Sequence, residues 1–424
     1  MSPKQLVTLI DGRRAGLLSQ DAHGRMAFDY HGDYLADRST TLLSLSLRID
    51  QRTFSRTEIT PVVTGLLPDN EDVVERWARL FGVRSGNPFA LLAHVGADVA
   101  GAVQFVPEDR LDELATGGLD PLSTTDIAQM LAELRSDPYT WQQQAGDRAG
   151  HFSLAGAQVK FALHHSPDGW ARPYGRIPTT HIVKPPITGI SDHDLNEHLC
   201  LQVASLLGLP AAASEIVEFG DERAIVVERF DRTRTPDGEV VRIHQEDMCQ
   251  ALGVPPMMKY QRDGGPGPAA IADLLREHSS SPEADVERFA RALVFNWVIG
   301  GTDAHAKNYG MLLRGRQARL APLYDLATAT VLPEWNPHQW ELAMRVDKKG
   351  KFKYITRGDW ERMARRLGVP FDLVRDTTTE YAARIGDAIQ TAAQSHVLAI
   401  NPAFVDRMTD AVTTHATDAA HRLT

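Results

Sequence analysis

Residues 300–310, GGTDAHAKNYG, place side chains that can bind metal and phosphate in one polar loop. Asp303 and Asn308 offer oxygen ligands, and Asp325 adds a second carboxylate 22 positions after Asp303 (325 − 303). Mg²⁺ prefers oxygen ligands and takes only a few of them from the protein, leaving the rest to phosphates and water. Two carboxylates and one carboxamide therefore indicate magnesium and phosphate chemistry.

The spacing from Asp303 to Asn308, D-x-x-x-x-N, matches the catalytic loop of protein kinases. In that loop the aspartate accepts the proton of the acceptor hydroxyl, and the asparagine holds a metal ion. Kinases have a second metal-binding aspartate in Asp-Phe-Gly, where this chain has the sequence YDL around Asp325. A plainer interpretation stays open here: Asp and Asn favour turns, and His305 and Lys307 are then solvated loop residues.

A helix and a hairpin are predicted on the two sides of this loop. Apolar residues recur at helical spacing from Val286 to Trp297, and the Gly-Gly pair that follows suits a left-handed helix end. Residues 309–313 and 320–324 are predicted as the two short strands of a hairpin. Because a hairpin brings its far end back to its near end, the loop carboxylate and carboxamide should lie beside Asp325.

Two further stretches have features of nucleotide binding. Residues 153–158, SLAGAQ, put small residues ahead of a strand, where successive backbone N–H groups can form a nest for phosphates. Taken alone, this stretch is explained better by a simple turn rich in small residues. Lys184, at a strand end before two prolines, fits the kinase lysine that contacts the phosphates, although it also fits a surface lysine. Residues 225–230 fit the strand from which kinases offer backbone groups to adenine.

The composition is that of a soluble globular protein with more than one packed unit. The chain has 424 residues, of which 43% are hydrophobic and 24% charged. Its net charge of −10 argues against a surface that holds DNA by charge alone, although it allows a DNA-binding partner. The first residues, MSPKQLVTLIDGRRAG, lack the apolar core of a signal peptide, and no stretch is apolar enough for a membrane helix. We therefore expect a cytoplasmic protein without membrane association.

Strand patterns dominate the start of the chain and helical patterns its end. Residues 1–50 alternate strand-like runs with turn signals such as Asp11-Gly12, which predicts a small antiparallel β unit. After residue 245 the pattern is mostly helical, with an interruption at residues 262–268, RDGGPGP. The two cysteines form no CxxC pair, which argues against structural zinc and against a disulfide framework.

The motifs in their order along the chain resemble one family. The succession SLAGAQVKFAL, HIVKPP, NEHLCLQVASLLGLP, VVERFDR, GGTDAHAKNYGMLL and LAPLYDL is similar to the HipA family. These are serine/threonine protein kinases that act as toxins of bacterial type II toxin–antitoxin pairs. The N-terminal β unit also resembles that family's first subdomain, so the resemblance covers essentially the whole chain. One departure is Val159, where a polar or acidic residue is expected before the loop lysine.

The resemblance implies an α+β, two-lobed, protein-kinase-like fold. Its N-terminal lobe is expected to be β-rich and to include an extra N-terminal β subdomain, and its C-terminal lobe to be mostly helical. The implied domains are residues 1–145 (HipA N-terminal subdomain), 146–232 (N-lobe with the nucleotide-binding loop and the ATP lysine) and 233–424 (helical C-lobe with the catalytic loop and the metal-binding aspartate).

The resemblance also implies a role for each matching residue. Asp303 matches the catalytic aspartate, Asn308 and Asp325 match the metal ligands, and Lys184 matches the ATP-binding lysine. Ser153 matches a loop serine that these kinases phosphorylate on themselves, which disrupts ATP binding and switches the enzyme off. The remaining nucleotide-binding residues are expected to be Ala155, Gly156, Ala157, Gln158, Lys160, Glu228, Arg229, Phe230, His305, Lys307 and Tyr324.

These matches predict a kinase that uses ATP and Mg²⁺ to phosphorylate a protein, with an aminoacyl-tRNA synthetase as the candidate substrate, and to phosphorylate itself on Ser153. The expected partners are a HipB-like helix-turn-helix antitoxin and, through it, operator DNA. Two alternatives stay open. A small-molecule phosphotransferase of similar build fits the loop, because the loop does not define a protein acceptor. The second alternative is a mainly non-catalytic subunit that binds the antitoxin as a co-repressor. The retained catalytic residues argue against this alternative.

Overall fold

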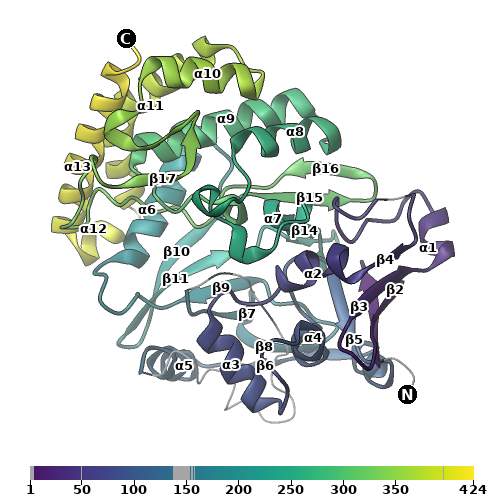
Figure 1. Ribbon diagram of the computed structural model, residues 1–424. Coiled ribbons are helices and arrows are strands. Elements are labelled where there is room, and N and C mark those ends of the chain that lie inside the picture. The colour runs from purple at the N-terminus through teal and green to yellow at the C-terminus, as the bar shows by residue number, and fades with distance from the viewer. Residues whose placement is uncertain (1–3, 49, 137–152, 154–155, 157, 395) are drawn as a thin grey trace. The chain divides into compact units, whose positions relative to one another are not determined.

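The computed structural model describes residues 4–48, 50–136, 153, 156, 158–394 and 396–424. The chain forms two compact units. Unit 1 comprises Met1–Pro185, Val217–Met257 and Met311–Ala318, and unit 2 comprises Pro186–Ile216, Met258–Gly310 and Arg319–Thr424. Each unit therefore combines segments that are far apart in the sequence, as the colours of Figure 1 show.

The N-terminal part of unit 1 is an antiparallel sheet with strand order β4-β3-β2-β1-β5, which confirms the predicted small β unit. Asp11 and Gly12 turn between β1 and β2 with φ of 53° and 71°, as a tight hairpin turn requires. The strands and helices are β1 (Lys4–Ile10), β2 (Arg13–Gln20), β3 (Met26–Tyr30), β4 (Thr53–Phe54), β5 (Val103–Val106), α1 (Gly32–Ala36), α2 (Arg56–Thr64), α3 (Glu71–Leu80) and α4 (Pro88–Val95).

A second sheet has the strand order β10-β11-β9-β7-β8-β6. Apolar residues of α5, among them Ile127 and Leu131, pack with Phe161 and Val226 of the sheet in one buried cluster. The elements are η1 (Glu108–Leu114), β6 (Gly117–Pro121), α5 (Thr124–Ser136), β7 (Phe161–Ser166), β8 (Gly169–Gly175), β9 (His181–Lys184), β10 (Ser214–Phe219) and β11 (Glu222–Glu228). The sheet holds Lys184 at the end of β9, where Lys184 pairs with Ile225 of β11.

Shorter strands follow along the chain. β12 (Arg232–Arg234) pairs with β13 (Val240–Arg242), and β14 (His244–Asp247), which leads into α7 (Met248–Ala251), joins the sheet β14-β15-β16. β15 (Gly310–Arg314) and β16 (Gln317–Leu320) form the predicted hairpin. Its second strand was wrongly predicted at residues 320–324, because β16 ends at Leu320. Pro322 has no N–H to donate, and Leu323 instead forms an isolated bridge with Ala211.

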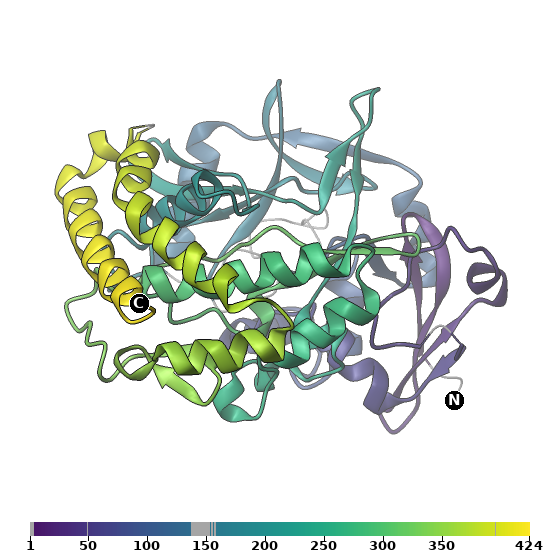
Figure 2. The same ribbon diagram turned by 90° about the horizontal axis from the view of Figure 1, so that it is seen from above.

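Unit 2 is mostly helical. Figure 2 shows α11 and α13 running side by side, and α11 also packs on α9 and α6. Large aromatic side chains fill the interior, including Trp297, Trp360 and Tyr381. The helices are α6 (His193–Leu206), η4 (Gln261–Asp263), α8 (Pro268–His278), α9 (Pro282–Ile299), η5 (Ala306–Asn308), η6 (Phe352–Tyr354), α10 (Arg357–Leu367), α11 (Phe371–Ala393), α12 (Val397–Ile400) and α13 (Pro402–His421), while η3 (Pro256–Met258) lies where the chain passes from unit 1 to unit 2.

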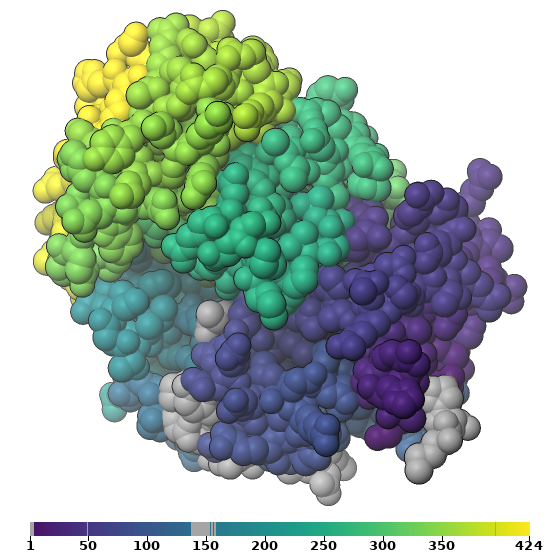
Figure 3. All heavy atoms as spheres, viewed as in Figure 1, coloured from purple at the N-terminus to yellow at the C-terminus, as the bar shows by residue number. Residues whose placement is uncertain are grey.

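One small sheet interrupts these helices. β17 (Glu341–Val346) pairs with β18 (Lys349–Lys351), and β17 packs on η4 while α10 packs on α8. The space-filling view in Figure 3 shows the green segment around η4 and α8 beside the yellow-green segment of β17 and α10 on the surface of unit 2. In the described part of the chain, no helix combines the length and apolarity needed to cross a membrane.

The predicted division into three domains is not decided by these two units. The boundary at residue 145 lies outside the described residues, and the boundary at 232 falls at the start of β12 within unit 1. Both boundaries stay predictions.

Candidate active site

Helix α9 holds the loop that carries Asp303. The helix ends at Gly300, whose φ of 71° is left-handed and whose N–H donates to the carbonyls of Asn296 and Trp297, as predicted for this Gly-Gly pair. The next residue has no room for a side chain, because a Cβ on Gly301 would lie 2.7 Å from the Asn296 Oδ1 atom. The loop therefore leaves the helix in one defined direction.

The loop closes on the carbonyl oxygen of Asp303. This oxygen accepts hydrogen bonds from the backbone N–H of His305 at 2.7 Å and from Nδ2 of Asn308 at 2.8 Å. His305, Lys307 and Asn308 are buried, with exposed fractions of 4%, 5% and 7%, whereas the Asp303 side chain is 64% exposed. The turn thus buries the other polar residues and presents the carboxylate of Asp303 at the surface of unit 2.

Two side chains lie next to this carboxylate. Nε2 of His305 is 4.0 Å from Oδ2 of Asp303, and the hydroxyl of Tyr260 donates to Oδ1 at 2.6 Å. Tyr260 was missed by the sequence reasoning. It precedes Asp303 by 43 residues, in a stretch that has no spacing typical of a motif, so no sequence signal pointed to it.

Asp325 follows a residue that is tied to the same loop. The hydroxyl of Tyr324 donates to the Lys307 carbonyl at 2.6 Å. Asp325 itself is exposed and has a left-handed φ of 57°, which is uncommon outside glycine. Such backbone conformations cluster at functional sites, where the surrounding structure holds them. The link through Tyr324 fits the expectation that the second carboxylate lies near the loop.

The side-chain oxygen atoms of Asn308 and Asp325 in unit 2 suit a hard cation. Among the residues that the structure describes, no three His, Cys, Asp or Glu side chains gather as a metal site. A magnesium ion needs only one or two protein carboxylates besides phosphate and water. The Nδ2 atom of Asn308 is engaged with Asp303, so Oδ1 is the amide atom that can act as a ligand. Asn308 and Asp325 therefore fit Mg²⁺ bound together with phosphates.

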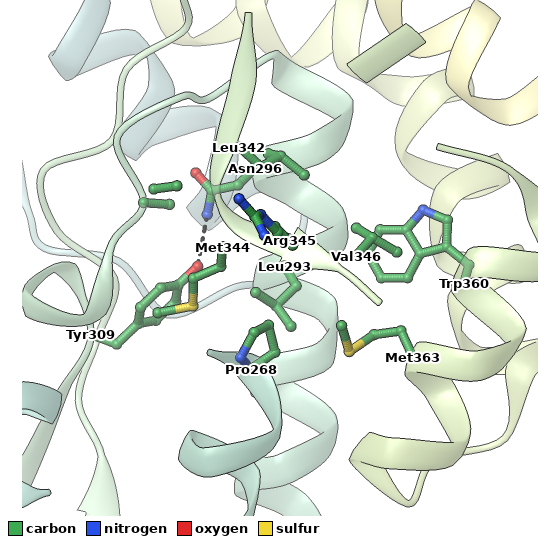
Figure 4. Close-up of a pocket in the computed structure, with 12 residues that line it drawn as sticks. Pro268, Leu293, Asn296, Tyr309, Leu342, Met344, Arg345, Val346, Trp360 and Met363 are labelled. Atoms are coloured by element: carbon green, nitrogen blue, oxygen red, sulfur yellow. Dashed lines mark hydrogen bonds between the residues drawn. The ribbon is translucent and has the colours of Figure 1, made fainter. Parts of the chain in front are cut away.

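A narrow apolar pocket lies behind the loop in unit 2, and Figure 4 shows its lining. Nδ2 of Asn296 donates to the Tyr309 hydroxyl at 3.2 Å across one side of it. Its volume of about 10 Å³ is no more than a single water molecule needs. The pocket is therefore packing that supports the loop, and it is too small for a nucleotide. Its lining consists of Pro268, Leu293, Asn296, Ala304, Tyr309, Leu342, Ala343, Met344, Arg345, Val346, Trp360 and Met363.

Ser153 is buried in unit 1. It is 0% exposed, its hydroxyl donates to the Leu66 carbonyl at 2.8 Å, and its N–H donates to the Asp98 carbonyl at 3.0 Å. The predicted autophosphorylation site is therefore held inside the unit in this conformation.

The small-residue loop after Ser153 is described only in part. Gly156 has a φ of 110°, and a Cβ there would lie 2.6 Å from Nζ of Lys160, so the lysine ammonium is close to the glycine backbone. Nε2 of Gln158 donates to the Pro185 carbonyl at 3.3 Å, next to Lys184. Lys184 is 7% exposed. Unit 1 thus places two lysines and a glycine turn in neighbouring segments, while Ala155 and Ala157 lie outside the described residues.

Arg229 belongs to a buried ion network. Nη2 of Arg229 donates to Asp231 at 2.8 Å and to the Val99 carbonyl at 2.9 Å, and the Arg229 N–H donates to the Thr180 carbonyl. Burial opposes its charge, but the neighbouring carboxylates outweigh burial and raise the pKa of Arg229. Its guanidinium therefore stabilises unit 1, and its carbonyl accepts from the Arg232 N–H at 3.1 Å. Glu228 is exposed and Phe230 is half-buried.

Known proteins resemble this chain over most of its length. The family model of the HipA N-terminal domain matches residues 6–106, and that of the HipA-like C-terminal domain matches residues 152–396. Y4mE of Sinorhizobium fredii, a protein named as a kinase, is 39% identical over 88% of this chain and 90% of its own length. The serine/threonine-protein kinase toxin HipA of Shewanella oneidensis is 30% identical over 86% of both chains.

A solved structure has the same fold. The complex of Shewanella oneidensis HipA with HipB and its operator DNA contains a chain that matches 97% of this one, with a TM-score of 0.83 and 28% identity. The α+β fold with a β-rich first unit and a mostly helical second unit is thus the fold of HipA, as the sequence predicted. From both family models and the curated relatives it follows that this chain belongs to the HipA family.

Proposed function

We propose that this chain is a serine/threonine protein kinase that uses Mg·ATP and acts as the toxin of a type II toxin–antitoxin system. The observation that carries the proposal is the loop of unit 2, in which a closed turn presents the Asp303 carboxylate beside Asn308. A kinase needs a carboxylate at this position of the motif to receive the acceptor hydroxyl. The likeness to relatives named as kinases supports the same assignment.

The residues of unit 2 would orient the acceptor and the phosphates. Asp303 takes the proton of the acceptor hydroxyl as the oxygen of that hydroxyl forms its bond to the γ-phosphorus of ATP, and the bond to the β-phosphate oxygen breaks to release ADP. Asn308 and Asp325 would hold Mg²⁺, which neutralises charge on the phosphates when bound. Lys307 adds a positive charge to the same loop, with His305 and Tyr324 beside it at the nucleotide.

The residues of unit 1 would bind the nucleotide. Lys184 is assigned to the phosphates, and the segment from Ala155 to Lys160 to the loop that covers them. Glu228, Arg229 and Phe230 are assigned to the adenine side. The closeness of the Lys160 ammonium to the Gly156 backbone supports the loop assignment, because it puts a cation beside the backbone of the loop.

Autophosphorylation on Ser153 would switch the enzyme off. Its hydroxyl is buried and donates to a carbonyl, so the serine must leave these contacts before it can be phosphorylated. A phosphoserine carries about −1.5 to −2 charges and three acceptor oxygens, which cannot return to a site that needs a donor. Phosphorylation would therefore keep the loop out of its present position.

The partners we propose are a HipB-like helix-turn-helix antitoxin and a protein substrate connected with translation, such as an aminoacyl-tRNA synthetase. In the solved structure that resembles this chain, HipA is in a complex with HipB and its operator DNA. Contact with DNA would run mainly through the antitoxin, because this chain has a net charge of −10.

The first test is mass spectrometry of the intact chain and its peptides after incubation with Mg·ATP. Wild type should gain phosphate at Ser153, and Asp303→Ala should lose at least about a hundredfold in rate, because removal of a catalytic base costs about 10² to 10⁴. Asp273→Ala, an exposed carboxylate of α8, is the matched control and should behave like wild type.

The other outcomes separate the alternatives. Asp303→Ala that labels itself at the wild-type rate would contradict the assignment of the loop. Phosphorylation of small hydroxylated or amino compounds without any labelled protein would favour a small-molecule phosphotransferase. Antitoxin binding by a wild type that transfers no phosphate at all would favour a non-catalytic subunit.

A further inference from the structure

The side chain of Tyr260 makes a short hydrogen bond to the proposed catalytic aspartate. Its hydroxyl lies 2.6 Å from Oδ1 of Asp303, and both residues belong to unit 2. A phenol O–H that donates to a carboxylate is a charge-assisted bond, roughly twice as strong as a bond between neutral groups. Tyr260 can therefore hold a carboxylate that is otherwise 64% exposed to solvent.

The backbone on both sides of Tyr260 is fixed. Its carbonyl accepts from the N–H groups of Asp263 and Gly265, each at 3.0 Å, which closes a turn around η4. The preceding carbonyl, that of Lys259, accepts from the N–H of Ala306 at 3.2 Å, so the segment is also tied to the catalytic loop itself. The main chain on either side of Tyr260 thus sets its position, and this position does not depend on the hydrogen bond from its hydroxyl to Asp303.

The ring of Tyr260 is held as well. Its edge meets the buried ring of His305, with 4.8 Å between centroids and 85° between planes. The guanidinium of Arg262 lies over it at 4.9 Å and the ammonium of Lys259 at 5.6 Å, within the range of cation–π attraction. A ring restricted on several sides loses little freedom when its hydroxyl binds, which makes the bond to Asp303 more effective.

We propose that Tyr260 is a positioning residue that holds Asp303 in the orientation needed to receive the acceptor hydroxyl. The proposal rests on the kinase function proposed above. With the tyrosine bound to Oδ1, the second carboxylate oxygen, Oδ2, is the one that faces the acceptor. In the transfer step Oδ2 takes the hydroxyl proton, the hydroxyl oxygen bonds to the γ-phosphorus and ADP leaves, while the proton of Tyr260 stays on its own oxygen.

The kinetic test compares Tyr260→Phe with Tyr354→Phe. The first change removes the hydroxyl and keeps the ring contacts, and the second removes a hydroxyl from an exposed tyrosine of the same unit. Tyr260→Phe should lower kcat of phosphate transfer by about tenfold or more, as expected for the loss of a hydrogen bond to a charged group, and leave the KM for ATP unchanged. Tyr354→Phe should leave both constants unchanged.

Three results would overturn the proposal. An unchanged kcat in Tyr260→Phe would mean that the bond does not orient Asp303 for transfer. A higher kcat would mean that the hydroxyl blocks the place of the acceptor, so that Tyr260 inhibits the enzyme. A rise in the KM for ATP alone would assign Tyr260 to nucleotide binding and contradict the positioning role.

A double-mutant cycle on stability separates this proposal from the proposed function. Urea unfolding of wild type, Tyr260→Phe, Asp303→Ala and the double variant needs no catalytic activity. The loss of stability from Tyr260→Phe should disappear in the Asp303→Ala background. Equal losses in both backgrounds would show that the two side chains do not interact, even in an active enzyme. A wild type without transferase activity would refute the kinase function. If the stability effects of Tyr260→Phe and Asp303→Ala were still coupled in that case, the hydrogen bond between the two side chains would be real but would serve another role.

Discussion

At the scale of single residues, Glu246 shows how burial changes the chemistry of a carboxyl group. It is 2% exposed in unit 1, where the Leu45 N–H donates to Oε1 at 2.8 Å and the Ser44 hydroxyl donates to Oε2 at 2.5 Å. Burial raises the pKa of Glu246 from 4.5 to about 8, although both hydrogen bonds act in the opposite direction. The folded protein therefore holds this carboxyl mostly protonated at neutral pH.

The pH dependence of stability should reveal this group. Between about pH 4.5 and 8 the folded state binds the proton that the unfolded chain has lost, so the free energy of unfolding falls as pH rises through this window. The decline is a few kcal/mol at most, at about 1.4 kcal/mol per pKa unit. Glu246→Gln keeps the shape of the side chain and removes its titration. The free energy of unfolding of this variant should therefore fall less than that of wild type as pH rises through this window.

Urea unfolding at several pH values between about 5 and 8 measures this difference. Glu75→Gln changes an exposed glutamate of α3 in the same unit and serves as the control, with the pH dependence of wild type. Parallel curves for Glu246→Gln and wild type over the whole range would contradict the raised pKa.

At the scale of elements, the segment from Met258 to Gly267 determines where Tyr260 lies. Its turn is tight: a Cβ on Gly265 would lie 1.8 Å from the Met258 carbonyl oxygen and 2.8 Å from that of Tyr260. The segment is also joined to β17, because Oε1 of Gln261 accepts from the Arg345 N–H at 2.7 Å. A glycine is required at residue 265 because the backbone of the same turn occupies the space of a side chain.

Gly265→Ala should therefore displace Tyr260 without touching any predicted catalytic residue. The forced shift should cost about 1–3 kcal/mol of stability, as for other insertions into closely packed sites, and should lower phosphate transfer at least as much as Tyr260→Phe. Gly86→Ala is the matched control, because a Cβ at residue 86 meets no atom within 4 Å. Urea unfolding and the transfer rate measure both effects, and full activity in Gly265→Ala would show that the turn does not position the tyrosine.

At the scale of the whole molecule, a buried ion network joins parts of unit 1 that are far apart in the sequence. Asp98 pairs with Arg232 at 2.9 Å and with Arg242 at 3.3 Å, and Arg229 pairs with Asp231 at 2.8 Å. Burial alone would raise the pKa of Asp98, but Arg232, Arg242 and Arg229 outweigh it and hold this pKa well below its usual range. The network thus links residue 98, in the part matched by the HipA N-terminal model, to residues 229–242.

Removing Asp98 should destabilise unit 1 strongly. Asp98→Ala removes one of the two carboxylates that neutralise the buried guanidinium groups and leaves only Asp231, and truncating one member of a buried charge network typically costs about 3–5 kcal/mol. Because the folded pKa of Asp98 is lowered, its contribution is present above the unfolded pKa near 3.8 and is lost as pH falls below it. Urea unfolding at neutral pH measures the loss. Asp50→Ala, which breaks the exposed pair with Arg48, should leave the midpoint unchanged, and an equally stable Asp98→Ala would contradict the role of the network.

The sequence by itself determined the family, the fold class and the position of the polar loop. These follow from local patterns: glycines that end a helix, the spacing of Asp303 and Asn308, and alternating strand residues in the first part of the chain. Local patterns can be read from a sequence because neighbours along the chain set the backbone geometry. The roles of the site residues remain proposals, since they rest on the matching of motifs.

Only the tertiary structure decided the surroundings of each side chain. It brought Tyr260 to Asp303 across 43 residues, placed the Arg229 guanidinium in an ion network instead of leaving it for a ligand, and buried Ser153. It also ended β16 at Leu320, because the residues after it pair with a distant segment. Burial, charge partners and such pairings depend on contacts between distant parts of the chain, and no local spacing encodes them.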